Sequence, residues 1–225
     1  MRRVPRWIVA LLAATLAVQI AWHARTAPQK SAETLPSAPR AEVLRLTAFG
    51  EDAAAARLLM LYLQDFDVRG LDYGRLTGWL GAALALDPRS AYPLFLAARV
   101  FAETPDPAAS RLALEFIYQE FSRDPNRRWP WLAHAALLAK HRLKDLPLAR
   151  RYAAAVQREA TAPDVPLWAK QMEVFILEDM NELEAARVLL GGLLASGKIH
   201  DADEVRFLRQ KLQELEQRSR QPGSK

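Results

Sequence analysis

The sequence predicts an all-α protein, a right-handed solenoid of antiparallel helical hairpins behind an N-terminal transmembrane helix. The first observation behind this prediction is a repeated dipeptide in which a bulky apolar residue precedes a proline. It occurs at Tyr92-Pro93, Trp129-Pro130 and Val165-Pro166, and the prolines are 37 and 36 residues apart. The second is composition, because alanine and leucine are abundant while only nine glycines occur, which favours helices over sheets. The third is an apolar run near the N-terminus.

The apolar run covers residues 7–22 and contains two polar side chains, Thr15 and Gln19. Tryptophans flank it and arginines precede it, as is typical of a segment held at membrane interfaces. We therefore predict a transmembrane anchor over residues 1–23. It would lie in the inner (cytoplasmic) membrane of a Gram-negative cell, with the N-terminus cytoplasmic and the C-terminal domain periplasmic. A cleaved secretory signal is the alternative, although the residues after the run offer no good cleavage site.

The excess of positive charge belongs to the N-terminus. Of the 31 basic residues, five lie in residues 1–30 without an acidic one, which leaves 26 against 26 acidic residues elsewhere. A domain without net charge lacks the electrostatic footprint that phosphate binding demands, so we predict no nucleic-acid partner. The chain has no cysteine, which excludes disulfides and thiolate chemistry.

Composition divides the remaining chain. Prolines and small residues make 24–40 a predicted flexible linker. The helical repeat domain is expected over 41–199, a charged capping helix over 200–219 and a disordered tail over 220–225. After a short helix that ends near Phe49, about four hairpins with a period of about 37 residues follow. Their helices are expected at 52–66 and 72–86, 93–102 and 108–122, 130–141 and 146–160, and 166–178 and 183–196.

Three series of residues recur with this period and indicate equivalent positions. Proline loses no hydrogen bond at the first helical position, so one series is interpreted as the starts of the first helices: Pro93, Pro130 and Pro166. A second series of prolines is interpreted as ending the second helices: Pro88, Pro125 and Pro163. The third series consists of bulky side chains on the second helices, expected to pack between neighbouring hairpins: Trp79, Phe116, Tyr152 and Leu189.

The segment Trp129-x-x-Leu132-Ala133-x-x-Ala136 resembles the first-helix pattern of the tetratricopeptide-repeat (TPR) family. Segments beginning at Tyr92 and Val165 match this pattern more loosely. The resemblance covers about residues 50–200, and it departs from the family in its missing glycines and in a period longer than about 34 residues. It implies a TPR-like fold, similar to single-span, membrane-anchored bacterial TPR proteins, with a concave groove for extended peptides or partner helices.

No pattern in the chain indicates catalysis, a cofactor or a metal. His134 and His141 are seven residues apart on one predicted helix, whereas metal ligands on a helix prefer closer spacing and carboxylate company. No nucleophile lies in a recognisable motif with a base, and no glycine-rich phosphate loop occurs. Gly191-Gly192 is interpreted as a place of close helix packing. We therefore predict that the protein is not an enzyme and uses no cofactor.

The cluster Arg127-Arg128-Trp129-Pro130-Trp131 combines basic and aromatic side chains, which can bind nucleic acids or acidic peptides. We favour a structural interpretation, because the two tryptophans lie in the apolar register of the repeat. Trp129 and Trp131 are then wedges between neighbouring hairpins, while Arg127 and Arg128 form a solvated turn.

The resemblance places a candidate peptide-binding groove on polar residues of the first helices: Arg57, Gln64, Arg99, His134, Lys140, Lys170 and Gln171. Because the charged side chains in this set are basic, the expected partner carries an acidic segment or a C-terminal carboxylate. The alternative is that they only solvate the surface. The predicted function is a membrane-anchored protein–protein interaction scaffold that recruits partners for envelope assembly, secretion or another complex. Two other functions stay open, a secreted binding module released by cleavage and a non-catalytic accessory subunit of an enzyme complex.

Overall fold

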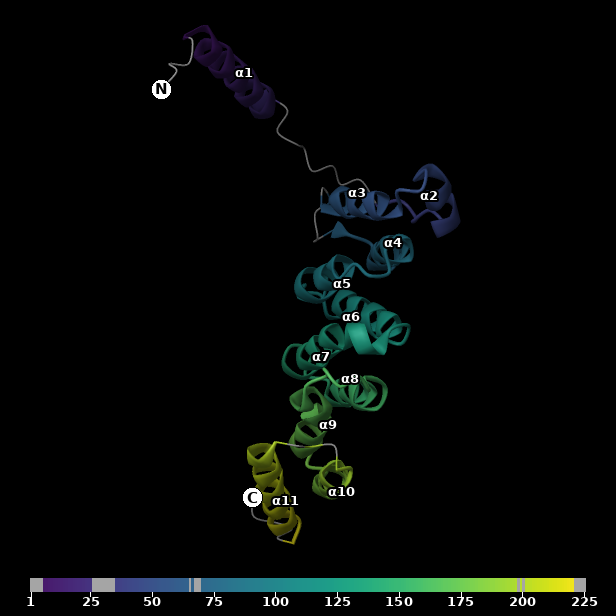
Figure 1. The fold of residues 1–225 in the computed structure, drawn as a ribbon, viewed down its shortest axis with the longest axis vertical. Coiled ribbons are helices and arrows are strands. Elements are labelled where there is room, and N and C mark those ends of the chain that lie inside the picture. Colours follow the sequence, from purple (N-terminus) through teal and green to yellow (C-terminus); the bar gives the residue numbers. More distant parts are fainter. Residues whose placement is uncertain are drawn as a thin grey trace.

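The computed structural model describes residues 6–25, 35–64, 66, 70–197, 199 and 201–220. Every regular element in this part of the chain is helical and no strand occurs in it, which confirms the all-α prediction. From α2 (Ala41–Thr47) onward the helices form an elongated stack that ends at α11 (Ala202–Arg220) (Figure 1). Most of the predicted linker, 26–34, and the tail, 221–225, lie outside the described residues.

The predicted membrane anchor falls in α1 (Arg6–Arg25). Within the described residues, no helix reaches the length and apolarity needed to cross a bilayer. The anchor therefore stays a prediction from the sequence.

The last residues of the predicted linker pack on the helical stack. Leu35 is buried, and its carbonyl accepts a hydrogen bond from Arg75 Nη1 at 2.9 Å. Trp79 Nε1 donates to the carbonyl of Pro36 at 2.8 Å. The chain therefore joins the folded domain at Leu35, ahead of the predicted boundary at residue 41.

Four helical hairpins follow α2. They are α3 (Asp52–Gln64) with α4 (Tyr73–Leu86); α5 (Tyr92–Leu96), continued by the π-helix η2 (Ala97–Phe101), with α6 (Pro107–Phe121); α7 (Pro125–His141) with α8 (Leu146–Glu159); and α9 (Leu167–Asp179) with α10 (Leu183–Ala195). The closest packing joins consecutive helices, and further contacts join equivalent helices of neighbouring hairpins, such as α4 with α6 and α7 with α9. This nearest-neighbour pattern is typical of helical repeat proteins.

The bulky side chains on the second helices lie in the core, as predicted for three of the four. Trp79, Phe116 and Tyr152 are buried, whereas Leu189 is only partly buried. Phe116 lies against α4 of the preceding hairpin, and the Tyr152 ring stacks on Tyr118 of α6 with 5.5 Å between ring centroids. These side chains therefore join one hairpin to the next.

One of the three proline helix starts is wrong. Pro93 lies in the first turn of α5 and Pro166 is the N-cap of α9, but Pro130 lies inside α7, which begins at Pro125. Pro125 thus starts a helix and does not end the preceding one. Pro130 is the sixth residue of α7, so it removes the hydrogen bond that an N–H there would donate to the carbonyl of Asn126.

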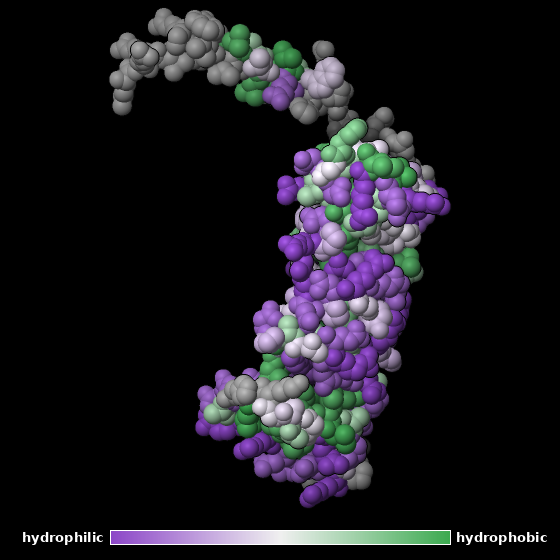
Figure 2. Space-filling view, turned by 45° about the vertical axis from the view of Figure 1, so that its right-hand side comes forward, coloured by the Kyte–Doolittle hydropathy of each residue, from purple (hydrophilic) through white to green (hydrophobic). Residues whose placement is uncertain are grey.

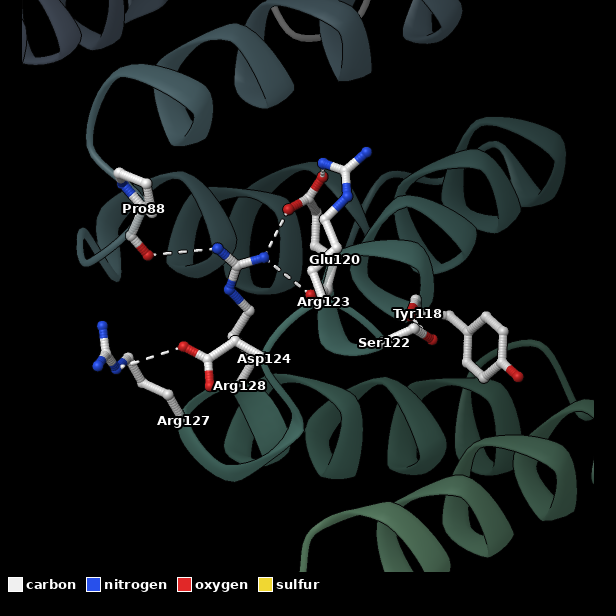
Figure 3. A network of polar contacts seen from close by, with 8 residues as sticks. All are labelled: Pro88, Tyr118, Glu120, Ser122, Arg123, Asp124, Arg127 and Arg128. Carbon is white, nitrogen blue, oxygen red and sulfur yellow. Dashed lines mark hydrogen bonds and ion pairs between the residues drawn. The ribbon is translucent and has the colours of Figure 1, made fainter.

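Arg128 is buried, so the interpretation of Arg127 and Arg128 as a solvated turn is wrong for Arg128. Its guanidinium points toward the ends of α4 and α6 (Figure 3). Nη1 lies 2.6 Å from Glu120 Oε2 and donates to the Glu120 carbonyl at 2.8 Å, while Nη2 donates to the Pro88 carbonyl at 3.2 Å. Arg123 also pairs with Glu120. Because these groups come from three successive segments of the stack, Arg128 ties the first three hairpins together.

The interpretation of Gly191 and Gly192 as a place of close packing is also wrong. A Cβ atom added at either position would meet no atom within 4 Å. Gly197, just after α10, has equally open space but a φ of 66°, in the left-handed region that glycine adopts readily.

This contrast predicts opposite effects of the same substitution. Gly192→Ala should raise the free energy of unfolding by about 0.5–1 kcal/mol, because alanine restricts the unfolded chain and favours the helix. Gly197→Ala should lower it by about 1 kcal/mol, since the left-handed backbone strains an L side chain. Urea unfolding of the full chain in detergent measures both values. Effects of the same sign would contradict this account.

Candidate functional site

One part of the predicted groove is a cavity of about 480 Å³ between α3 and α5. Its apolar lining comes mainly from Met60, Leu61 and Pro93. Two predicted groove residues, Arg57 and Gln64, line it as well, and Gln64 Nε2 donates to the Tyr92 hydroxyl at 2.9 Å. Because α3 and α5 are the first helices of adjacent hairpins, Arg57 and Gln64 line one shared cavity. Their role in binding a peptide stays a prediction.

A row of aromatic side chains extends this cavity to the third hairpin. The Tyr92 ring stacks on Phe95 at a centroid distance of 6.2 Å, and Phe95 meets Trp131 of α7 edge-on at 6.1 Å. Tyr92 and Phe95 are each 41% exposed, so their rings are accessible to a ligand. The sequence interpretation gave the wedge role to Trp131 and overlooked Tyr92 and Phe95. Their spacing of three residues on one helix was the signal available for finding them.

Trp129 and Trp131 both contact another hairpin, in opposite directions along the stack. Trp131 contacts Phe95 of the second hairpin, while the Trp129 ring lies 5.5 Å from that of Trp168 in α9. The predicted wedge role is therefore confirmed for both tryptophans, and Trp131 also contributes to the aromatic row.

Two further groove residues, Arg99 and His134, meet beside the aromatic row. Arg99 Nη1 lies 3.5 Å from His134 Nε2, and both side chains approach Glu103 Oε1 at 3.8 Å. Arg99 belongs to η2, in which the Ala102 N–H donates to the Ala97 carbonyl. Such single-turn π segments are frequent at functional sites. Burial lowers the pKa of His134, and the Arg99 charge lowers it further, while Glu103 opposes the shift.

A loss of stability on acidification follows from His134. Because its folded-state pKa lies below the ordinary value of 6.5, the fold disfavours the protonated imidazole. The stabilising effect of neutral His134 is complete above about pH 6.5 and is lost as the pH falls below that value. We expect urea unfolding to show a smaller pH dependence between pH 7.5 and 5 for His134→Gln than for the wild type. His141→Gln, at an exposed position of the same helix, should retain the full dependence. Equal pH profiles for wild type and His134→Gln would refute this assignment.

Two predicted groove residues near α9, Lys140 and Gln171, already bind acidic residues of the chain. Lys140 pairs with Asp179. Gln171 is buried, and its Nε2 donates to Glu204 of α11 at 2.9 Å. Lys211, also in α11, lies 3.0 Å from Glu178 of α9. The C-terminal helix thus covers this face of α9, and Gln171 is not available to a ligand.

The charge of the remaining groove is lower than the sequence indicated. Arg99 and Lys140 have acidic partners. Arg57 and Lys170 form no ion pair with any residue that the structure describes. Lys170 lies on α9, away from the cavity, so Arg57 is the basic residue that lines the cavity, together with one carboxylate, Asp87.

A second cavity, of about 420 Å³, lies between α8, α9 and α10. Its charged lining residues already have partners, since Arg150 lies 3.4 Å from Glu173, and Glu184 lies 2.8 Å from Arg187. Among the described residues, no group of three metal-ligating side chains occurs. The groove over α3, α5, η2 and α7 is therefore the stronger candidate site.

Comparison with protein-family models, with curated proteins and with solved structures found no match to this chain. The geometry of the chain defines it as all-α and helical-repeat-like, with a cavity between α3 and α5. The TPR resemblance rests on the residues of the repeats alone.

Proposed function

We propose that this protein is a membrane-anchored scaffold for protein–protein interaction, built as a right-handed, TPR-like solenoid that faces the periplasm. It would recruit partners for envelope assembly, secretion or another complex. The observation that carries this proposal is the continuity of one accessible surface over three hairpins. The cavity between α3 and α5 borders Tyr92, and the row Tyr92–Phe95–Trp131 continues from it to α7.

The chemistry of the surface favours a segment of protein as the ligand. Apolar and aromatic side chains of a partner fit the cavity and the exposed rings, and such anchors supply most of the binding energy at protein interfaces. Arg57 can bind a carboxylate of the same segment, because it forms no ion pair within the described part of the chain. The partner is therefore an extended peptide or a helix that combines an apolar anchor with one acidic group.

The proposed membrane location rests on the N-terminal sequence. Residues 7–22 are apolar but for Thr15 and Gln19, and the basic residues that precede them favour a cytoplasmic N-terminus. An alkaline-phosphatase fusion at the C-terminus tests this topology, since the enzyme is active only after export. An inactive fusion would reject the periplasmic location.

The groove is tested by affinity purification from crosslinked membranes with the full chain as bait. The variant Arg57→Glu/Tyr92→Ala reverses the free cation and removes a ring, and its expected effect is at least about a tenfold loss of captured partner. The matched control Arg158→Glu/Leu112→Ala changes the same kinds of residue at exposed positions on second helices. Equal capture by both variants would refute the groove assignment.

A further inference from the structure

Apolar side chains are exposed near both ends of the helical stack. The surface of α11 at one end is largely charged. At the other end, α2 has no buried residue, and Val43, Leu46 and the following Phe49 are 52%, 78% and 93% exposed. Figure 2 shows hydrophobic residues among hydrophilic ones at the end formed by α2–α4, a further hydrophobic area toward the end that carries α11, and a largely hydrophilic stretch between them. We name Val43, Leu46 and Phe49 the α2 face.

Arg45 and the partly buried Leu44 and Ala48 hold α2 against the domain. Arg45 Nη2 donates to the Ala85 carbonyl of α4 at 2.7 Å, and its Nε lies 3.8 Å from Asp52. Val43 and Leu46, three residues apart, share one side of the helix. A helix of seven residues is marginal without tertiary support. Leu44 therefore faces the domain, and Val43 and Leu46 form a second apolar side of α2 that faces outward.

The backbone holds Phe49 away from the protein. Its φ is 50°, in the left-handed region that bulky residues avoid, and Gly50 follows with a φ of 89°. Such a conformation is costly and persists where the surrounding structure imposes it, often at sites of interaction. Here the strained turn presents a phenyl ring to the surroundings.

The α2 face lies close along the chain to the apolar segment of the N-terminus. Nine residues, 26–34, separate α1 from Leu35, where the chain joins the domain. The apolar segment ends at Trp22, so twelve residues, 23–34, precede Leu35 outside it, and they reach at most about 40 Å even when fully extended. If residues 7–22 are in the bilayer, the end of the stack that carries α2 is held within that reach of the lipid surface.

From these observations we infer that the α2 face inserts into the membrane interface beside the anchor. The inference rests on the membrane anchor of the proposed function. Insertion buries Val43, Leu46 and Phe49 among lipid chains, and the anchor removes most of the entropy cost of bringing them there. The stack is then held to the membrane at two points, which limits its rotation and orients the groove.

The charges around the α2 face indicate which lipids it contacts. Residues 40–52 contain two arginines, Arg40 and Arg45, against three carboxylates, Glu42, Glu51 and Asp52. Contact is therefore hydrophobic and does not need anionic headgroups, unlike the binding of a basic amphipathic helix. A neutral phosphatidylcholine surface is sufficient.

The experiment uses single cysteines, because the natural chain has none. The full-length variants Leu46→Cys and Val188→Cys are labelled with an environment-sensitive fluorophore and reconstituted in phosphatidylcholine vesicles. Val188 is the matched control, since it is an aliphatic side chain on α10 that is 67% exposed. The label at position 46 should show a blue-shifted emission that nitroxide-labelled lipid quenches, and the label at position 188 should show neither. Phe49→Asp in the Leu46→Cys chain should abolish both signals.

Other outcomes overturn the inference and separate it from the proposed anchor. If the chain floats with the vesicles but the label at position 46 is not quenched, the anchor stands and the α2 face does not contact lipid. A blue shift that grows with the protein-to-lipid ratio, without quenching, assigns the face to a second copy of the chain. If the chain does not float with the vesicles, both the anchor and the inference fail.

Discussion

Replacing Arg128 with methionine is expected to lower the free energy of unfolding by about 3 kcal/mol. The side chain of Glu120 is 4% exposed and would lose its buried partner, while the Pro88 carbonyl would lose its donor. The remaining pair with the exposed Arg123 holds the loss at the lower end of the range for a broken buried ion pair. Thermal unfolding of the full chain in detergent should show a midpoint about 6–12 °C lower.

A neighbouring arginine supplies the matched control for this prediction. Arg127 is exposed and pairs with Asp124 at 3.5 Å, so Arg127→Met should change stability by less than about 1 kcal/mol. The double variant Glu120→Leu/Arg128→Met should recover most of the loss, because an apolar pair leaves no buried charge. If Arg128→Met were no more harmful than Arg127→Met, the network would not join the hairpins.

Two substitutions of Tyr152 are expected to change the free energy of unfolding in opposite directions. Tyr152→Ala should lower the free energy of unfolding by about 3–5 kcal/mol, because it leaves a cavity between the second and third hairpins. Tyr152→Phe should raise it by about 1 kcal/mol, because the buried hydroxyl has no hydrogen-bond partner in the described structure. The same burial, with the nearby Glu115 charge, raises the pKa of Tyr152.

Chemical denaturation of the wild type and both Tyr152 variants measures these effects. Leu189→Ala, at the equivalent but only partly buried position of the fourth hairpin, should cost less than Tyr152→Ala. A loss on Tyr152→Phe comparable to that on Tyr152→Ala would mean that the hydroxyl has a stabilising partner, contrary to this account.

Much of the fold could be predicted from the sequence because local residues set the helix limits. The second helices α4, α6 and α8 begin after Asp72, Asp106 and Asp145, and each of these carboxylates accepts a hydrogen bond from a backbone N–H of the first turn. The start of α7 was misplaced because Pro125 and Pro130 both satisfy the local rule for a helix start. Only packing between hairpins determines which of the two prolines starts the helix.

The candidate site was less predictable than the fold, since its properties depend on distant partners. Arg128 has the sequence context of a surface turn, but its acceptors lie 8 and 40 residues away. Gln171 was assigned to the groove by periodicity, yet α11 buries it, and a repeat pattern carries no information on how a terminal helix packs. Arg57 and Gln64 line one cavity because first helices of adjacent hairpins lie side by side.

Site-specific photocrosslinking tests the central proposal, that the first helices of this chain bind a partner protein. A photoreactive phenylalanine analogue is placed at Phe95 in the groove or at Leu112 on α6, positions that are 41% and 49% exposed. After irradiation of cells that express the full chain, a partner crosslink is expected at position 95, absent at position 112, and lost when Arg57→Glu is added. Equal crosslinking at both positions, or crosslinking at position 112 alone, would contradict binding in the groove.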